Sequence, residues 1–321
     1  ELIRLAVGAS GPCRGQAYAR RPGSPCVRVK ASVGGAFVLL CLIWGSTWLA
    51  IKLGVEEVPV FLSAMLRFAI AAAVLLALGA ALRRHLPRSR SEWGVVFLVG
   101  IVLFVGDYGL IYWGEANGVA SGLTAVLFAT MPLVTAIASH ALLPQERLTV
   151  RKLLGVGVGF GGIALIFRGQ LTGAGLGHFL PMLAVLIAAT CAGVSTASMR
   201  RWARGIDGFV FNGLAMGVGA LGLATVSLAS GERWTVPAWP GGLAPILYLS
   251  LVGSVVAFVA YLWLLHRVEA VTGSFILLIT PIVALAIGFL AASETIDVLD
   301  GVGTAITLGG IYLSLTRAVG I

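Results

Sequence analysis

Ten apolar stretches run along this chain, and each is long enough to cross a lipid bilayer. A helix rises about 1.5 Å per residue, so about 20 apolar residues span a hydrocarbon layer of about 30 Å. Apolar residues make up 59% of the chain and charged residues 11%, which leaves more apolar surface than a water-soluble fold can bury. We expect membrane spans over residues 31–53, 61–82, 93–114, 118–142, 149–167, 177–199, 208–230, 243–265, 270–292 and 299–316.

These spans are predicted to be helices. Strand spans would be about ten residues long with alternating polarity, whereas these stretches are about twice that length and apolar on all sides. In lipid the backbone must satisfy its own hydrogen bonds, and a helix does so within one segment. The joints are too short to hold an extramembrane domain, so we expect an all-α membrane protein with ten transmembrane helices.

Lys and Arg are distributed unevenly over the joints. If the N-terminal tail, the even-numbered joints and the C-terminus share one side, that side holds 18 of the 22 basic residues and the other holds Arg168 and Arg233. The basic side of a membrane protein is cytoplasmic, so we expect both termini in the cytoplasm and the chain in the cytoplasmic (inner) membrane. The basic residues form no folded basic face, which argues against nucleic acid as a partner.

Residues 1–30 combine six basic residues with Gly, Pro and Ser, and they lack an apolar core followed by a cleavage site. We expect them to form a disordered basic cytoplasmic tail. Cys13 and Cys26 lie in this tail and Cys41 and Cys191 in spans, so the cysteine spacing gives neither a disulfide framework nor a metal site.

The chain repeats itself after about 148 residues. The matching pairs are Gly45 and Gly193, Thr47 and Ser195, Lys52 and Arg200, Phe61 and Phe209, Pro132 and Pro281, and Glu146 and Glu294. Each copy holds five spans, an odd number, so the second copy enters the membrane the other way up. Two halves of opposite orientation can rock about a shared midplane site, which favours transport; duplication as a plain way to build a helix bundle is the alternative.

Four motifs carry a resemblance to a known family: IWGSTWLAIK (43–52), LRF (66–68), YGLIYWGEANGVASGLTAVLFATMPL (108–133) and ERLTVRKLLGVGVGFGGIALI (146–166). From residue 31 to about 318 the chain resembles the EamA-type transporters of the drug/metabolite transporter superfamily. The resemblance implies two inverted five-helix repeats, at residues 31–168 and 176–318, and export of small metabolites by alternating access. The family's usual Gly-Glu pairs are here Gln145-Glu146 and Ser293-Glu294, so only the Glu carries over.

Among the charged residues of the spans, where charge is costly and usually functional, three stand out: Lys52, Arg67 and Asp107. Arg67 and Asp107 lie at similar depth in consecutive spans, which predicts a salt bridge, direct or through a water. Asp107 is then either a protonatable coupling group or one half of a static clamp, and both readings stay open. Lys52 either reaches water with its long side chain or guards the mouth of a cavity.

Further candidates are aromatic and hydroxyl side chains. Trp44 and Thr47 share one face of the first span, and Tyr108 and Tyr112 share one face of the third. All four are candidate substrate contacts. We weight Trp44 and Tyr108 above the others, with core packing as the alternative, because Tyr112 is expected near the interface, where aromatic belts occur anyway.

Pro132 and Pro281 lie in the middle of the duplicated spans, where each is expected to bend its helix. Thr130 and Thr280 stand close by and are predicted to satisfy freed backbone groups or to contact substrate. The bends are either hinges or ordinary kinked packing.

The sequence thus favours a secondary-active permease for small metabolites such as amino acids, driven by the solute's own gradient or by protons. It shows no ATP-binding motif, and we expect no cofactor and no metal. The glycines of residues 157–162 match a dinucleotide fingerprint as a string, but they lie within a span and are expected to let helices approach closely. A membrane-embedded interaction or sensor subunit is the alternative, and an intramembrane enzyme a weaker one, because no paired acids or nucleophile with its base appear.

Overall fold

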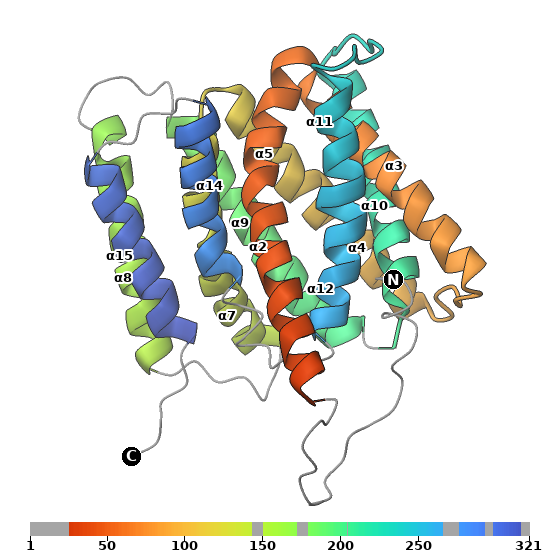
Figure 1. Cartoon of the computed structure of the whole chain (residues 1–321), viewed down its shortest axis with the longest axis horizontal. Coiled ribbons are helices and arrows are strands. Elements are labelled where there is room, and N and C mark those ends of the chain that lie inside the picture. Colours follow the sequence, from red (N-terminus) through yellow and green to blue (C-terminus); the bar gives the residue numbers. More distant parts are fainter. Residues whose placement is uncertain are drawn as a thin grey trace, which may run out of the picture.

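The computed structural model describes residues 26–142, 150–171, 179–203, 205–265, 276–292 and 298–315. Within these residues every regular element is a helix, so the all-α prediction is confirmed for this part of the chain. The elements are α2 (Cys26–Glu57), α3 (Val60–Ala81), α4 (Arg90–Val99), η1 (Gly100–Asp107), α5 (Tyr108–Ala116), α6 (Ser121–Phe128), α7 (Met131–Leu142), α8 (Val150–Leu171), α9 (Phe179–Trp202), α10 (Gly208–Ala229), α11 (Leu243–Leu247), η2 (Tyr248–Val256), α12 (Ala257–Leu265), α14 (Ile276–Ala292) and α15 (Val298–Leu315) (Figure 1).

Seven of these helical segments are long and apolar enough to cross a membrane, counted over the described residues. They begin at Val33, Val60, Arg90, Ser121, Phe179, Gly208 and Leu243. The other three predicted spans contain α8, α14 and α15, which are not among the seven, so the count of ten stays a prediction. Residues 26–30 belong to α2, and the expected tail otherwise lies outside the described residues, as do Glu146 and Glu294; the boundary of the tail stays a prediction.

The helices pack in pairs that recur after a shift of about 148 residues. α3 lies along α10, and α8 lies along α15 at one edge of the bundle (left in Figure 1). α2 packs on α14 as α9 packs on α7, and η1 packs on α10 as η2 packs on α3. Each of these contacts joins a helix before residue 172 to one after residue 178, so the two parts of the chain interlock.

Glycines allow the closest of these approaches. A Cβ at Gly45 would collide with the Val283 side chain of α14, and one at Gly193 would lie 2.9 Å from the Val134 side chain of α7. At the α8–α15 crossing, a Cβ at Gly162 would lie 2.6 Å from the carbonyl oxygen of Gly303, and one at Gly310 would lie 2.6 Å from that of Gly155. Small residues at such positions let helix backbones meet.

Two of the long helical segments, Arg90–Ala116 and Leu243–Tyr261, each contain a π-helical stretch. These stretches, η1 and η2, begin 148 residues apart, at Gly100 and Tyr248. A π-helix holds an extra residue per turn, is rare, and often marks a functional position. The sequence analysis did not foresee either segment.

The start of α3 is capped by a residue of the distant loop that follows α10. Pro59 precedes α3 and supplies no side-chain cap. Instead, the Glu232 carboxylate accepts hydrogen bonds from the backbone N–H groups of Phe61 and Leu62, each at 2.9 Å, and from the Ser227 hydroxyl at 2.6 Å. This contact holds one end of the α3–α10 pair.

The start of α10 is capped locally and is also tied to the loop after α3. The Asp207 carboxylate accepts hydrogen bonds from the N–H groups of Phe209 at 3.0 Å and Val210 at 3.4 Å. Its other oxygen forms an ion pair with Arg84 at 3.4 Å, where both side chains are partly exposed. The α3–α10 pair is therefore held at both ends.

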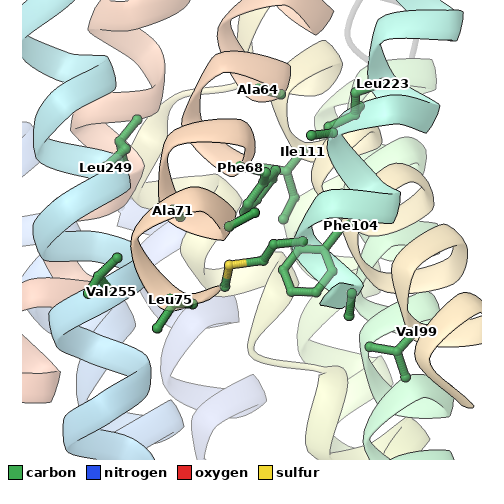
Figure 2. Close-up of a cluster of buried hydrophobic side chains, with 14 of the residues drawn as sticks. Ala64, Phe68, Ala71, Leu75, Val99, Phe104, Ile111, Leu223, Leu249 and Val255 are labelled. Carbon is green, nitrogen blue, oxygen red and sulfur yellow. The ribbon is translucent and has the colours of Figure 1, made fainter. Parts of the chain in front are cut away.

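The largest buried cluster lies between α3, η1, α5, α10 and η2. Phe68 of α3 and Phe104 of η1 lie side by side at its centre (Figure 2), with ring centroids 5.0 Å apart at a steep angle. Edge-to-face packing of this kind is the favourable arrangement for two rings. This apolar cluster packs around the buried charged residues Arg67 and Asp107.

The two mid-span prolines have different surroundings. The fourth predicted span breaks between Phe128 and Met131, and Pro132 is the second residue of the new helix α7, a position that needs no backbone N–H donor. Pro281 lies inside the continuous helix α14. The predicted kinks are thus a helix break in one half and an internal proline in the other.

Candidate functional site

Arg67 of α3 is the largest fully buried side chain among the described residues, with 1% of its surface exposed. Its Nε donates to the Ser254 hydroxyl of η2 at 3.2 Å, and its Nη1 donates weakly to the Tyr112 hydroxyl of α5 at 3.5 Å. The guanidinium also lies 5.0 Å and 4.9 Å from the ring centroids of Phe68 and Tyr108. Cation–π contacts and hydroxyl groups therefore stabilise this charge in the protein interior.

Asp107 is the last residue of η1 and is also buried, with 1% of its surface exposed. Its Oδ1 is buried and has no hydrogen-bond partner among the described residues. No ion pair within 4.0 Å joins Asp107 to Arg67 in the described part of the chain, although the two charges attract one another at longer range. The direct form of the predicted salt bridge is therefore not present in this conformation, and the water-mediated form stays a prediction.

Tyr108 and Tyr112 extend this centre along η1 and α5. The Tyr108 ring stacks nearly parallel on Phe104, with centroids 5.9 Å apart, and meets Phe68 edge-on at 4.8 Å. Tyr112 is fully buried in the same cluster. Its hydroxyl thus faces the interior of the bundle, while its expected depth near the membrane interface stays a prediction.

Thr47 and Trp44 of α2 both face the continuous helical segment that contains η2 and α12, at different positions along it. The Thr47 methyl group is 2.9 Å from the point where a Cβ on Gly253 would stand, and Arg67 Nη2 is 3.7 Å from the same point. Gly253 thus leaves room for Thr47 to approach the guanidinium. Trp44 is half-buried and instead packs on Phe258 and Tyr261 of α12, with ring centroids 6.2 and 5.2 Å apart.

The remaining predicted residues are two threonines, two prolines and Lys52. The Thr130 hydroxyl donates to the Leu127 carbonyl at 2.7 Å, and the Thr280 hydroxyl donates to the Ile276 carbonyl at 2.6 Å, so each satisfies its own helix. Pro132 and Pro281 are buried beside them, and Lys52 is half-buried on α2. Among the described residues, no three His, Cys, Asp or Glu side chains gather to hold a metal ion.

Ser254 is the contact that the sequence analysis missed. It stands in the apolar run of η2, and its hydroxyl accepts the hydrogen bond of Arg67 Nε from the first half. The one hint in the sequence was that two serines, Ser250 and Ser254, stand in an otherwise apolar span. The Ser250 hydroxyl donates to the Ile246 carbonyl of its own helical segment. A single hydroxyl in an apolar segment does not indicate which of several helices it will face.

The arrangement can do two things chemically. A buried guanidinium surrounded by hydroxyls and aromatic faces can hold a polar or anionic group. A neighbouring carboxyl group with an unused oxygen can take up or release a proton. Both lie where α2, α3, η1, α5 and η2 meet, so any change in the packing of the two parts of the chain alters this centre.

Comparison with known proteins gives a consistent result. The model of the EamA-like transporter family matches residues 34–168 and, a second time, residues 179–316. An uncharacterized transporter of Bacillus subtilis, YoaV, is 28% identical over 291 residues, which cover 89% of this chain and 97% of that protein. An uncharacterized inner membrane transporter of Escherichia coli, YedA, is 29% identical over 283 residues, covering 87% and 89%. A solved crystal structure matches with a TM-score of 0.64 at 21% identity, covering 88% of this chain and 97% of the other, and this likeness supports the fold.

Proposed function

Because the chain belongs to the EamA-like transporter family, we propose that this multi-pass membrane protein is a secondary-active permease exporting small metabolites. Amino acids and related compounds are the proposed substrates, and alternating access is the proposed mechanism. The solute's own gradient or an ion gradient supplies the drive. The observation that carries the proposal is the Arg67 centre, a charged and aromatic site at the junction between the two family-matched segments.

The proposed architecture is ten transmembrane helices in two inverted five-helix repeats, residues 31–168 and 176–318. Its support is the pairing of helix contacts: α2 on α14 with α9 on α7, and η1 on α10 with η2 on α3. If the repeats are inverted, each such pair is one contact seen from opposite sides of the membrane. Exchanging these contacts then gives inward-open and outward-open states of similar energy.

In the proposed site, the substrate's polar end meets Arg67, Tyr108 and Tyr112. Thr47 and Asp107 complete the polar wall, and Trp44 and Lys52 lie at the approach to it. Thr130 and Thr280, beside Pro132 and Pro281, belong to the helices whose bending opens and closes the cavity. A mixed aromatic and polar wall suits a small amphipathic solute.

The proposed orientation is tested by cysteine labelling. Both termini are placed in the cytoplasm, which puts Ser89 of the loop before α4 inside and Gly231 of the loop after α10 outside. Single Ser89→Cys and Gly231→Cys variants, in a background whose four native cysteines are replaced, are exposed to a membrane-impermeant thiol reagent in intact cells. Labelling at 231 alone is expected, and labelling at 89 alone would overturn the orientation.

The function itself is tested by flux. The purified chain is reconstituted into vesicles preloaded with a panel of labelled amino acids and related metabolites, and efflux is compared with protein-free vesicles. Arg67→Met is expected to abolish the flux that the wild type shows, at equal amounts of folded protein. Absence of flux for every panel member, with another protein co-purifying from native membranes, would favour a role as an interaction or sensor subunit.

A further inference from the structure

The unused oxygen of Asp107 is the strongest unexplained feature of the described residues. The side chain is 99% buried, since 1% of its surface is exposed, and its Oδ1 has no hydrogen-bond partner among them. An ionised carboxylate in a membrane interior needs donors or a close opposite charge, and a neutral carboxyl group needs far less. This conformation therefore suits an Asp107 that carries a proton.

The surroundings of Asp107 supply few groups that could stabilise its charge. η1 packs against α4, α5, α9 and α10, and α3 approaches it through Arg67. Arg67 is the cation that acts on it, because α10 has no titratable side chain, the charged residues of α4 lie in its first turn, and Arg200 and Arg201 of α9 are exposed in the last turn of that helix. The other titratable groups near the centre are Cys191 on α9 and Tyr108, Tyr112 and Glu115 on α5.

Arg67 has two alternative partners, one in each half of the protein. In this conformation it donates to Ser254 of η2, and it makes no ion pair with Asp107 within 4.0 Å. An ionised Asp107 would attract the guanidinium away from a neutral hydroxyl, because a charge-assisted hydrogen bond is roughly twice as strong as one to a neutral group. Moving to Asp107 would remove the hydrogen bond between α3 and η2.

We infer that Asp107 is the proton-binding site of this protein and that loss of the proton transfers Arg67 from Ser254 to Asp107. With the proton bound, the carboxyl group is neutral and Arg67 links α3 to η2. When the proton leaves to water on the open side, the carboxylate pairs with the guanidinium and the α3–η2 link opens. The inference rests on the proposed transport function, to which it adds the proton as the coupling ion.

Proton binding is measured without any substrate. The full-length protein in lipid nanodiscs is titrated with acid while infrared difference spectra record the carbonyl stretch of protonated carboxyl groups. The wild type is expected to show a titrating band that Asp107→Asn lacks. Asp207→Asn is the matched control, because asparagine also caps a helix and Asp207 lies outside the interior, and it is expected to retain the band.

Thermal unfolding separates this inference from a static clamp. Asn mimics the neutral carboxyl group, so Asp107→Asn is expected to leave the unfolding midpoint near that of the wild type. A static clamp predicts a large loss for each of Asp107→Asn and Arg67→Met, because each single change leaves a buried charge unpaired, and recovery in the double variant. That pattern would overturn the inference.

Ser254 gives the third measurement. Ser254→Ala removes the competing partner of Arg67, so the guanidinium pairs with Asp107 more readily and favours its ionised form. The infrared band is then expected to titrate about one pH unit or more toward acid, while Ser254→Thr, which keeps the hydroxyl, leaves the midpoint in place. An unchanged midpoint in Ser254→Ala would remove Arg67 exchange from the mechanism.

Flux measurements distinguish failure of this inference from failure of the proposed function. Asp107→Asn is expected to retain exchange of a substrate across the membrane and to lose stimulation by a pH gradient. Retained stimulation in a folded Asp107→Asn protein refutes the proton site while leaving transport intact. If the wild type transports nothing, the infrared titration still decides whether Asp107 binds a proton, and Asp107→Glu confirms that a band follows the carboxyl group.

Discussion

The two halves of this chain share a packing plan but not a chemistry. Positions 148 residues after Arg67, Asp107 and Tyr112 are Ala215, Val255 and Ala260, all buried and apolar. The second half contributes Ser254 to the centre, while the first half contributes every charge. The comparison teaches that the packing of the helices is used twice, whereas the charged and aromatic centre is built once.

The starts of α3 and α10 repeat this contrast at the surface. Pro59 and Asp207 are 148 residues apart, and so are Arg84 and Glu232. At α10 the cap is local and Arg84 reinforces it; at α3 the local cap is missing and Glu232 replaces it. Equivalent loops thus reach equivalent helix starts with opposite charges.

The largest loss of stability is expected where α8 crosses α15. It tests whether the two helices approach each other equally closely at the matching glycines Gly162 and Gly310. Gly162→Ala and Gly310→Ala each place a Cβ against backbone atoms of the facing helix, which cannot move aside. Each is expected to cost about 3 kcal/mol of unfolding free energy, and the two costs should be similar. Unfolding in mixed micelles of SDS and a mild detergent measures both.

The matched controls for this crossing are Gly157→Ala and Gly309→Ala, since nothing lies within 4 Å of a Cβ at either position. Neither should destabilise the protein, because alanine has a higher helix propensity than glycine. If only one of Gly162→Ala and Gly310→Ala greatly lowers the unfolding free energy, the two halves are not equivalent at this crossing.

Glu232→Ala is expected to have the next largest effect, about 2 kcal/mol, because it removes a charged acceptor from two backbone N–H groups and one hydroxyl. Hydrogen exchange should accelerate at the first turn of α3 before other helices respond. Glu232→Gln keeps an acceptor and should recover part of the loss. Unchanged protection of Phe61 and Leu62 in Glu232→Ala would mean that water replaces the cap fully.

The helix contacts at Gly45 and Gly193 should differ in how well a second substitution relieves the collision that alanine causes there. Gly45→Ala meets only side-chain atoms of Val283 below 3.0 Å, so it is expected to cost about 1–2 kcal/mol and to be rescued by Val283→Ala. Gly193→Ala also meets the Thr135 backbone nitrogen at 3.0 Å, so Val134→Ala should rescue it only partly. Double-variant cycles of thermal or SDS unfolding measure the two rescues; equal rescue at both seams would contradict the difference.

Arg84→Ala is expected to have the smallest effect, below about 1 kcal/mol, because its ion pair with Asp207 is partly exposed and Asp207 keeps its local cap. The loss should shrink further in high salt. An effect as large as that of Glu232→Ala would show that the cross-loop contact, and not the local cap, starts α10.

Hydropathy and repetition predicted much of this molecule. The apolar stretches predicted the helical segments and their order. Gly45 and Gly193 were recognised as a matching pair, but their close approaches to α14 and α7 were not foreseen. The glycines of residues 157–162 were only half right: Gly159 and Gly162 face α15, while Gly157 and Gly161 have open space. A period of 3.6 residues says which residues share a face, but in lipid every face is apolar, so it does not say which face is buried.

The site was harder to predict for the same reason. Arg67 and Asp107 were chosen from the sequence because burying a charge in a membrane is costly, so a charged residue within a span usually has a function. Their partners depend on side-chain direction across helices far apart in sequence, so the contacts of Arg67 with Ser254 and Tyr112 were not predicted. The π-helical segments also escaped notice, since they arise from packing and leave no compositional signal.

The two π-helical segments also carry a record of ancestry. A π-helix is an α-helix with one residue inserted, and an insertion is a discrete event in a gene. Because η1 and η2 begin 148 residues apart, the simplest history has one insertion in an ancestral half, followed by duplication of that half. The difference between the halves at Arg67 and Asp107 then arose after that duplication, so relatives that differ at these two positions should still share both insertions.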